Sequence, residues 1–135
     1  MRKKTCLELN DAARIGQAAM AHAQTRQWAV SVAVVDEGAG LLWFQRSDDA
    51  APISAHIAQA KAATSALGKR ESRIYEEMIN NGRVSFLSAP QLSGLLEGGV
   101  PIMVDGQCVG AVGVSGVKSA EDAEIAKAGI AALGL

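Results

Sequence analysis

Apolar residues alternate with other residues in four segments of the chain, which fall into two closely spaced pairs. The segments are residues 28–36, 41–46, 100–104 and 107–115. Alternation with a period of two is typical of β-strands, because successive side chains point to opposite faces. Asp105-Gly106 separates the second pair and favours a type I′ turn, and Glu37-Gly38-Ala39-Gly40 supplies the glycines of a short loop in the first. The pattern predicts two β-hairpins.

The second hairpin has a predictable register if its loop contains only two residues. Ile102 then lies opposite Val109. One face of the hairpin would carry a shallow set of mostly apolar residues: Val100, Ile102, Val104, Val109, Ala111, Gly113 and Ser115. Gly110 and Gly113 weaken a strand interior unless something approaches the backbone closely. That partner is either a packed helix or a ligand.

Apolar residues recur every three or four positions in three other segments, which predicts α-helices, and cap and stop signals predict a fourth, shorter helix. We expect helices from about Asn10 to Arg26, from about Pro52 to Leu67, from Ser72 to about Asn80, and from Ser119 towards the C-terminus. Proline suits the first turn of a helix, and serine is a common cap. Residues 83–96 contain Pro90 and Gly94 without a sustained period, so we expect a loop or short turns there.

The predicted order of elements is helix, hairpin, helix, helix, hairpin, helix. Two hairpins from distant parts of the chain would join into one antiparallel sheet of four to five strands, with the helices covering one face. The sequence therefore predicts an α+β fold. A chain of 135 residues is the size of one domain, which we expect to span residues 1–135.

Charge and composition exclude several classes of protein. The 13 Lys and Arg residues are scattered against 14 Asp and Glu, so nothing points to nucleic acid or to an anionic membrane. The start is basic, but no apolar segment follows it, and no run approaches the length of a membrane span. Cys6 and Cys108 lie far apart without metal-ligand spacing, as expected for free thiols in a reducing compartment. We therefore expect a cytoplasmic protein.

The chain contains no complete catalytic motif, which leaves an enzymatic role open. The run from Gly113 to Val117 resembles a nucleophile elbow but ends in valine where the motif requires glycine. There is no phosphate-binding glycine loop and no zinc-protease motif. The two histidines, His22 and His56, each lack a second metal ligand three or four residues away. A functional site would have to pool residues from distant segments or from several subunits.

Four residues are candidates for such a pooled site. His22 lies on the apolar side of the first helix, where it could be an axial haem or metal ligand or a hydrogen-bonded core histidine. Cys108 could offer a thiolate to haem or act as a small core hydrophobe. Arg46 and Lys61, with Asp48, could pair with a carboxylate such as a haem propionate or form surface ion pairs. The residues alone leave these alternatives open.

Short motifs in a fixed order resemble one protein family over nearly the whole chain, from about Leu7 to Leu133. They are Val32-Ala33-Val34-Val35-Asp36 with Gly38 and Gly40, Leu41-Leu42 with Arg46 to Ala50, Ile57-Ala58 with Lys61-Ala62 and Thr64, Gly98-Gly99-Val100-Pro101-Ile102, Asp105-Gly106, Gly110 to Gly116, and Glu121-Asp122 with Ile125-Ala126. Together they resemble the GlcG/HbpS family, which also occurs as the C-terminal domain of PduO-type proteins.

This resemblance implies a profilin-like fold, with helices packed on a central antiparallel sheet, and assembly into dimers, tetramers or octamers. It also implies a haem-binding or haem-degrading protein. The family uses no invariant set of haem ligands, so the position of His22 on its helix face, rather than a family motif, makes it the expected metal ligand, with Arg46 or Lys61 near the propionates. Other members accompany propanediol, glycerol or glycolate utilisation enzymes, so a cofactor-free accessory protein that contacts pathway enzymes is the alternative. An enzyme acting on a small hydroxy acid, with Lys61, Asp36 and Asp122 as acid and base groups, is a third hypothesis.

Overall fold

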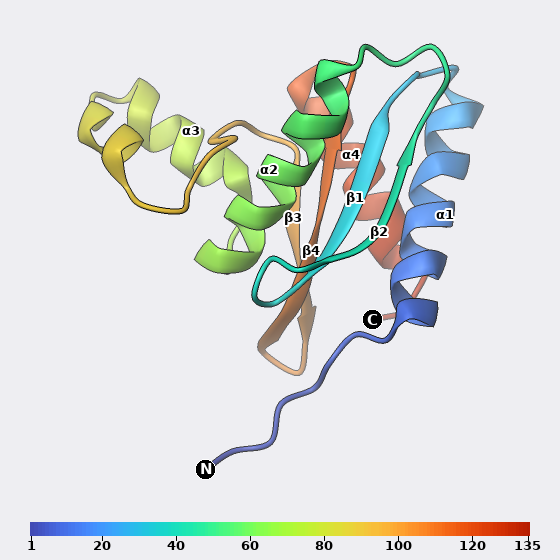
Figure 1. The fold of residues 1–135 in the computed structure, drawn as a ribbon, viewed down its shortest axis with the longest axis horizontal. Helices are drawn as coiled ribbons and strands as arrows, with labels where there is room; N and C mark the ends of the chain where they lie inside the picture. The colour runs from blue at the N-terminus through green and yellow to red at the C-terminus, as the bar shows by residue number, and fades with distance from the viewer.

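The computed structural model describes all 135 residues and contains one four-stranded antiparallel sheet, four α-helices and one short 3₁₀ helix (Figure 1). In chain order the elements are α1 (Leu9–Thr25), β1 (Ser31–Asp36), β2 (Leu41–Arg46), α2 (Ile53–Gly68), α3 (Ser72–Asn80), η1 (Val84–Ser88), β3 (Gly99–Val104), β4 (Gln107–Ser115) and α4 (Ser119–Ala131). Every predicted helix and strand is present, and the short helix η1 lies in the segment expected to hold a loop or short turns. None of the helices is both long enough and apolar enough to cross a membrane.

The two hairpins join through their inner strands, β1 and β4, which gives the strand order β2-β1-β4-β3. Val32 lies opposite Val114 and Val34 lies opposite Val112, and all four side chains are fully buried. The central strands of the sheet therefore come from distant parts of the chain. The predicted α+β fold, with one antiparallel sheet built from two hairpins and helices packed on it, is confirmed.

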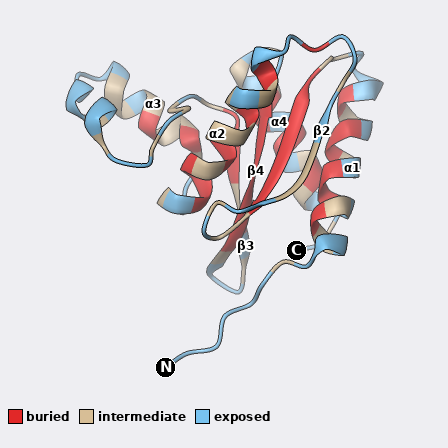
Figure 2. Ribbon diagram, viewed as in Figure 1, coloured by how far each residue is buried: buried red, intermediate tan, exposed pale blue.

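Helices cover both faces of the sheet, whereas we expected them on one face only. α1 and α4 lie side by side on one face and bury Ile15 and Ile125 against the valines of β1 and β4. α2 packs on the opposite face, where Ala58 belongs to a second core cluster with Ala33. The reason lies in β1, whose residues Ser31 to Val35 are all buried, so both faces of the sheet present side chains that need covering (Figure 2).

A β-bulge changes the register predicted for the second hairpin. The register holds next to the turn, but Ile102 lies opposite Gly110 rather than Val109. One extra residue in β4 moves every later side chain to the other face of the sheet. The predicted shared face is therefore wrong beyond the bulge, because Ala111 packs in the cluster beneath α2 while Val112 packs with α1 and α4.

Gly113 allows α2 to lie directly on β4. A Cβ atom at this position would overlap the carbonyl oxygen of Ala58 and crowd the side chain of Ala62. Both of these residues are buried alanines on the sheet side of α2. Of the two partners expected for this glycine, a packed helix or a ligand, the structure contains the helix.

The turn between β1 and β2 is held by the carboxylate of Asp36. Its Oδ1 atom accepts hydrogen bonds from the backbone N–H groups of Gly38, at 2.9 Å, and Gly40, at 2.8 Å. A Cβ atom at Gly40 would lie 2.7 Å from Asp36 Oδ2, so glycine lets the carboxylate lie against the backbone of the turn. The Asp36 carboxylate is therefore engaged by the backbone and shapes the turn.

Candidate functional site

The structure brings Lys61 and Asp122 together in the protein interior. Lys61 Nζ lies 3.0 Å from Asp122 Oδ2 and donates a 2.9 Å hydrogen bond to the carbonyl oxygen of Val114. The N–H of Val117 donates to the other carboxylate oxygen of Asp122, at 3.2 Å. The Lys61 and Asp122 side chains are 3% and 2% exposed, and neither lines a cleft. The pair joins α2, β4 and α4, which keeps Lys61 away from any ligand in solution.

Burial is the main cause of the raised pKa of Asp122, because removing a carboxylate from water disfavours its charged form. Lys61 opposes this rise in pKa through its charge and its hydrogen bond, and the Val117 N–H does so as well. An ion pair closed off from solvent can hold elements together, but it gives a substrate no access to either group. The geometry therefore offers no support for acid–base chemistry by these residues on a small hydroxy acid.

His22 lies at the seam between α1 and α4 and is partly exposed. Its Nε2 atom is 2.8 Å from Glu124 Oε2, and a guanidinium nitrogen of Arg26 is 3.5 Å from the same oxygen. The His22 and Glu124 side chains are 28% and 44% exposed. Helical spacing placed His22 with the buried Ala19, but its ring lies at the edge of that apolar face. One ring nitrogen of His22 is therefore engaged by a carboxylate while the side chain remains open to solvent.

Replacing His22 by alanine is expected to raise the pKa of Glu124. The hydrogen bond with His22 is the main cause that lowers the pKa of this carboxylate, and the charge of Arg26 adds to it. Because the pKa of the folded state is depressed, the interaction stabilises the fold at neutral pH and is lost as the pH falls through that pKa. An NMR titration of the Glu124 carboxyl carbon measures the change. Arg26→Ala should give a smaller rise, and an unchanged pKa in His22→Ala would contradict the assigned cause.

Arg46 and Cys108 line two different clefts. Arg46 is exposed at the end of β2 and lines a cleft of about 480 Å³ together with Asp48. Cys108 is half-buried near the β3–β4 turn and lines another cleft of about 260 Å³. Neither His22 nor Lys61 lines a cleft, so the structure does not bring the four candidate residues together. No three His, Cys, Asp or Glu side chains are grouped closely enough to hold a metal ion.

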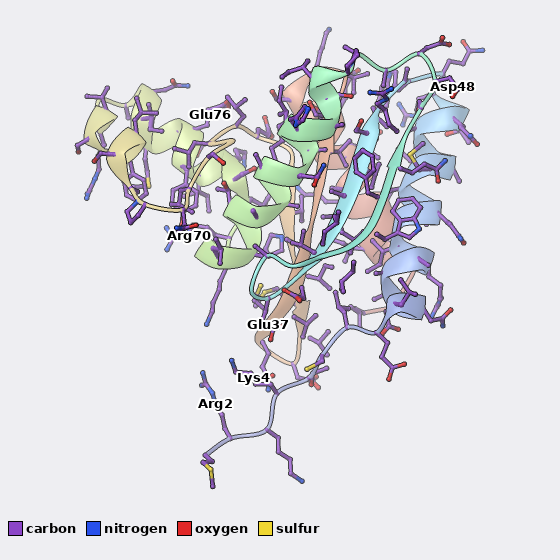
Figure 3. All side chains as sticks on the ribbon, in the orientation of Figure 1. Arg2, Lys4, Glu37, Asp48, Arg70 and Glu76 are labelled. Carbon is purple, nitrogen blue, oxygen red and sulfur yellow. The ribbon has the colours of Figure 1, made fainter.

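The cleft that contains Cys108 is here named the cationic cleft. Its lining residues are Arg2, Lys4, Thr5, Glu37, Lys69, Met103, Gly106, Gln107 and Cys108. Figure 3 shows Arg2, Lys4 and Glu37 near one another at the lower end of the molecule in that view. The Thr5 N–H donates a 3.2 Å hydrogen bond to Gln107 Oε1, which ties the N-terminal residues to the β3–β4 turn. Because its lining contains three cationic side chains and one carboxylate, this cleft is suited to bind an anion.

A second cleft, here named the apolar cleft, has a volume of about 500 Å³. It is lined by Gly38, Ala39, Ala63, Leu67, Gly68, Tyr75, Pro90, Gln91 and Leu92. Sequence reasoning missed both clefts, because their residues come from separate segments that share no period and no motif. The only local signals were the turn after Asp36, the helix end at Gly68 and the Asp105-Gly106 turn. These signals locate segments that border the clefts but do not show that the segments lie close together in the fold.

Comparison with known proteins shows which family has this fold and these motifs. The sequence profile of the family described as haem degrading protein HbpS-like matches residues 7–131. The chain belongs to the HbpS-like family. Protein GlcG of Escherichia coli K12 is 54% identical to it over 115 residues, which cover 85% of each chain. The predicted resemblance to the GlcG/HbpS family is confirmed.

Two solved structures resemble this HbpS-like chain over almost its full length. A double mutant of HbpS from Streptomyces reticuli has a TM-score of 0.90 at 31% identity, covering 100% of this chain and 92% of that one. The complex of PduOC with haem has a TM-score of 0.85 at 26% identity, covering 95% of each chain. The sheet and the helices on both of its faces are therefore shared with a relative that binds haem.

Several residues that carry the family resemblance build the scaffold of this HbpS-like chain. Asp36, Gly38 and Gly40 form the β1–β2 turn, and Lys61 and Asp122 form the buried ion pair. These motifs explain why the fold could be recognised from the sequence. They give little information on where a ligand binds, because the scaffold residues hold one another.

Proposed function

We propose that this chain is a cytoplasmic, homo-oligomeric protein that binds haem or a related tetrapyrrole. The observation that carries the proposal is its membership of the HbpS-like family of haem-degrading proteins. The likeness to PduOC, whose structure is a complex with haem, adds support over 95% of the chain. The two free cysteines, Cys6 and Cys108, suit a reducing compartment such as the cytoplasm.

Exposed apolar side chains support the oligomeric part of the proposal. Val84 and Leu87 on η1 are 62% and 64% exposed, and Ile53 at the start of α2 is 59% exposed. Figure 1 shows that α3 and η1 extend away from the sheet as an arm. Apolar residues gathered on a projecting segment are typical of a protein–protein contact. We propose that further copies of this chain cover them.

His22 and Cys108 are the two candidate iron ligands in this proposal. Histidines that bind metals commonly use their second ring nitrogen to contact a carboxylate, and the His22–Glu124 contact of 2.8 Å fits that arrangement. Cys108 lines the cationic cleft, where it is half-buried and its sulfur could reach a bound ligand. The two residues lie in different places, so they are alternative ligands, and a single bound haem would use one of them.

A haem titration followed by absorbance tests the proposal. We expect a saturable shift of the Soret band at about one haem per chain, which His22→Ala or Cys108→Ser should abolish or displace, since loss of an axial ligand changes the electronic state of the iron. His56→Ala is the matched control, because His56 is exposed on α2 and lines no cleft.

Light scattering of the same samples tests the oligomeric part of the proposal, for which we expect a mass of two or more chains. Absence of any saturable Soret shift would contradict haem binding. A spectrum that neither substitution changes would remove both residues from the site while leaving haem binding intact.

The exposed apolar residues of the arm also favour a second candidate, a cofactor-free accessory protein of a propanediol, glycerol or glycolate utilisation pathway. Such a protein would use Val84 and Leu87 to contact a pathway enzyme rather than another copy of itself. A pull-down with purified diol dehydratase subunits distinguishes the two candidates. The accessory role would be favoured if the protein captures the subunits, if Leu87→Asp does not capture them, and if haem causes no saturable change in absorbance.

A further inference from the structure

Two segments of the chain contribute consecutive residues to the cationic cleft and to the apolar cleft. Glu37 lines the cationic cleft, and the next residue, Gly38, lines the apolar cleft. At the end of α2, Gly68 lines the apolar cleft, and the next residue, Lys69, lines the cationic cleft. The β1–β2 turn and the C-terminal end of α2 therefore border both clefts at once.

The cationic cleft carries an excess of positive charge. Arg2, Lys4 and Lys69 line it, and Glu37 is the one carboxylate in its lining, which leaves an excess of two positive charges at neutral pH. None of the three cations forms an ion pair within the chain. Their charges are therefore free to pair with a ligand, and an anion with two carboxylates would balance the excess.

The apolar cleft offers the complementary surface. Leu67 is 43% exposed there, and Ala63 and Leu92 add to the apolar part of a lining that also contains Gln91 and two glycines. Its volume of about 500 Å³ lies in the range of small-molecule sites, which are mostly apolar with a few polar groups that fix orientation. Here Gln91 lies in the cleft itself, and the charged groups line the cationic cleft.

We propose that the two clefts form one site for a tetrapyrrole, with the macrocycle against the apolar cleft and the propionate carboxylates in the cationic cleft. This inference rests on the proposed function. It places the macrocycle away from His22, Arg46 and Lys61, and it places Cys108 beside the propionates rather than at the iron. A flat apolar body that carries two carboxylates on one edge matches an apolar surface bordered by two excess positive charges. A small dianion would use only the cationic cleft, and a neutral apolar molecule would use only the other.

Absorbance titrations with haem and with haem dimethyl ester test the carboxylate half of the site. Lys4→Ala and Lys69→Ala should each weaken haem binding by up to about fivefold, the range expected for exposed ion pairs. Binding of the ester should stay unchanged in both variants, because the ester has no charge to pair with a cation. Lys3→Ala is the matched control, since Lys3 belongs to the same N-terminal segment but lines no cleft.

Leu67→Asp tests the apolar half of the site. A carboxylate in the apolar lining should weaken binding of haem and of its ester alike, by more than about tenfold, because it would be desolvated by either ligand. Leu9→Asp is the matched control, since Leu9 is an exposed leucine at the start of α1 that lines no cleft.

The outcomes distinguish a failure of this inference from a failure of the proposed function. If neither haem nor its ester binds the unsubstituted protein, the proposed function fails and the inference fails with it. If haem binds but the Lys4, Lys69 and Leu67 variants match their controls, the tetrapyrrole lies elsewhere and only the inference is overturned. A third outcome is that succinate competes with haem for binding while Leu67→Asp has no effect on haem binding. This outcome would indicate a site for small dianions and would also overturn the inference.

Discussion

Lys61→Ala is expected to destabilise the fold by about 3–5 kcal/mol, the cost of removing one partner from a buried ion pair. Asp122 would keep its carboxylate in the interior, 2% exposed, with the Val117 N–H as its remaining protein donor. The carbonyl oxygen of Val114 would also lose its hydrogen bond from Lys61. Urea unfolding of both proteins, followed by tryptophan fluorescence, measures the difference in the free energy of unfolding.

The loss in the free energy of unfolding caused by Lys61→Ala should become smaller as the pH falls. Burial raises the pKa of Asp122, and Lys61 opposes that rise, so the substitution should raise the pKa further. A carboxyl group whose folded-state pKa is raised favours the folded state at low pH and loses that contribution as the pH rises through the folded-state pKa. The variant should therefore recover stability towards acid relative to the unsubstituted protein. The negative charge of the neighbouring Glu121 adds to the rise in the pKa of Asp122.

Two further variants check the cause of this effect. Lys127→Ala removes an exposed lysine that lies 3.4 Å from Glu71, and it should cost less than about 1 kcal/mol, as exposed ion pairs usually do. The double substitution Lys61→Met with Asp122→Leu should be less destabilising than Lys61→Ala, because no charge remains buried without a partner. A deficit in Lys61→Ala as small as that of Lys127→Ala, or one that does not change with pH, would contradict the buried ion pair.

The two hairpins could be predicted because their signals are local. Asp105-Gly106 and the glycines after Asp36 lie within a few positions of the strands that they join. The bulge at Val109 could not be predicted, since β4 has small or apolar residues at successive positions and either register looks acceptable within the strand. The observed register depends on the helices that pack on the two faces of the sheet, and these come from distant parts of the chain.

The candidate site could be predicted less well than the fold. Helical spacing placed His22 near the buried Ala19, but it could not show that α4 brings Glu124 to the same seam. Lys61 was expected near a ligand because it lies on the helix that follows the polar end of the first hairpin. Only the packing of α2 and α4 reveals its buried partner, Asp122. The two clefts collect residues that are far apart in the chain, and such a gathering leaves no pattern in the sequence.

Gly113→Ala is expected to destabilise the fold by about 3 kcal/mol, at the upper end of the cost of overpacking a core. The added methyl group would overlap the carbonyl oxygen of Ala58 and crowd Ala62, so α2 would have to move away from β4. A backbone atom cannot swing aside as a flexible side chain can, which is why the expected cost is high. The free energy of unfolding in urea, with tryptophan fluorescence as the signal, measures it.

The sign of this effect distinguishes close helix packing from an ordinary strand glycine. In a strand without a close neighbour, alanine is more stable than glycine by roughly 0.5–1 kcal/mol, because glycine loses more conformational freedom on folding. Gly38→Ala is the matched control, since a Cβ atom there would meet its nearest neighbour, Asp36 Oδ1, at 3.5 Å, an ordinary contact distance. Its free energy of unfolding should change by less than about 1 kcal/mol. A Gly113→Ala protein as stable as Gly38→Ala would show that α2 does not rest on β4 at this glycine.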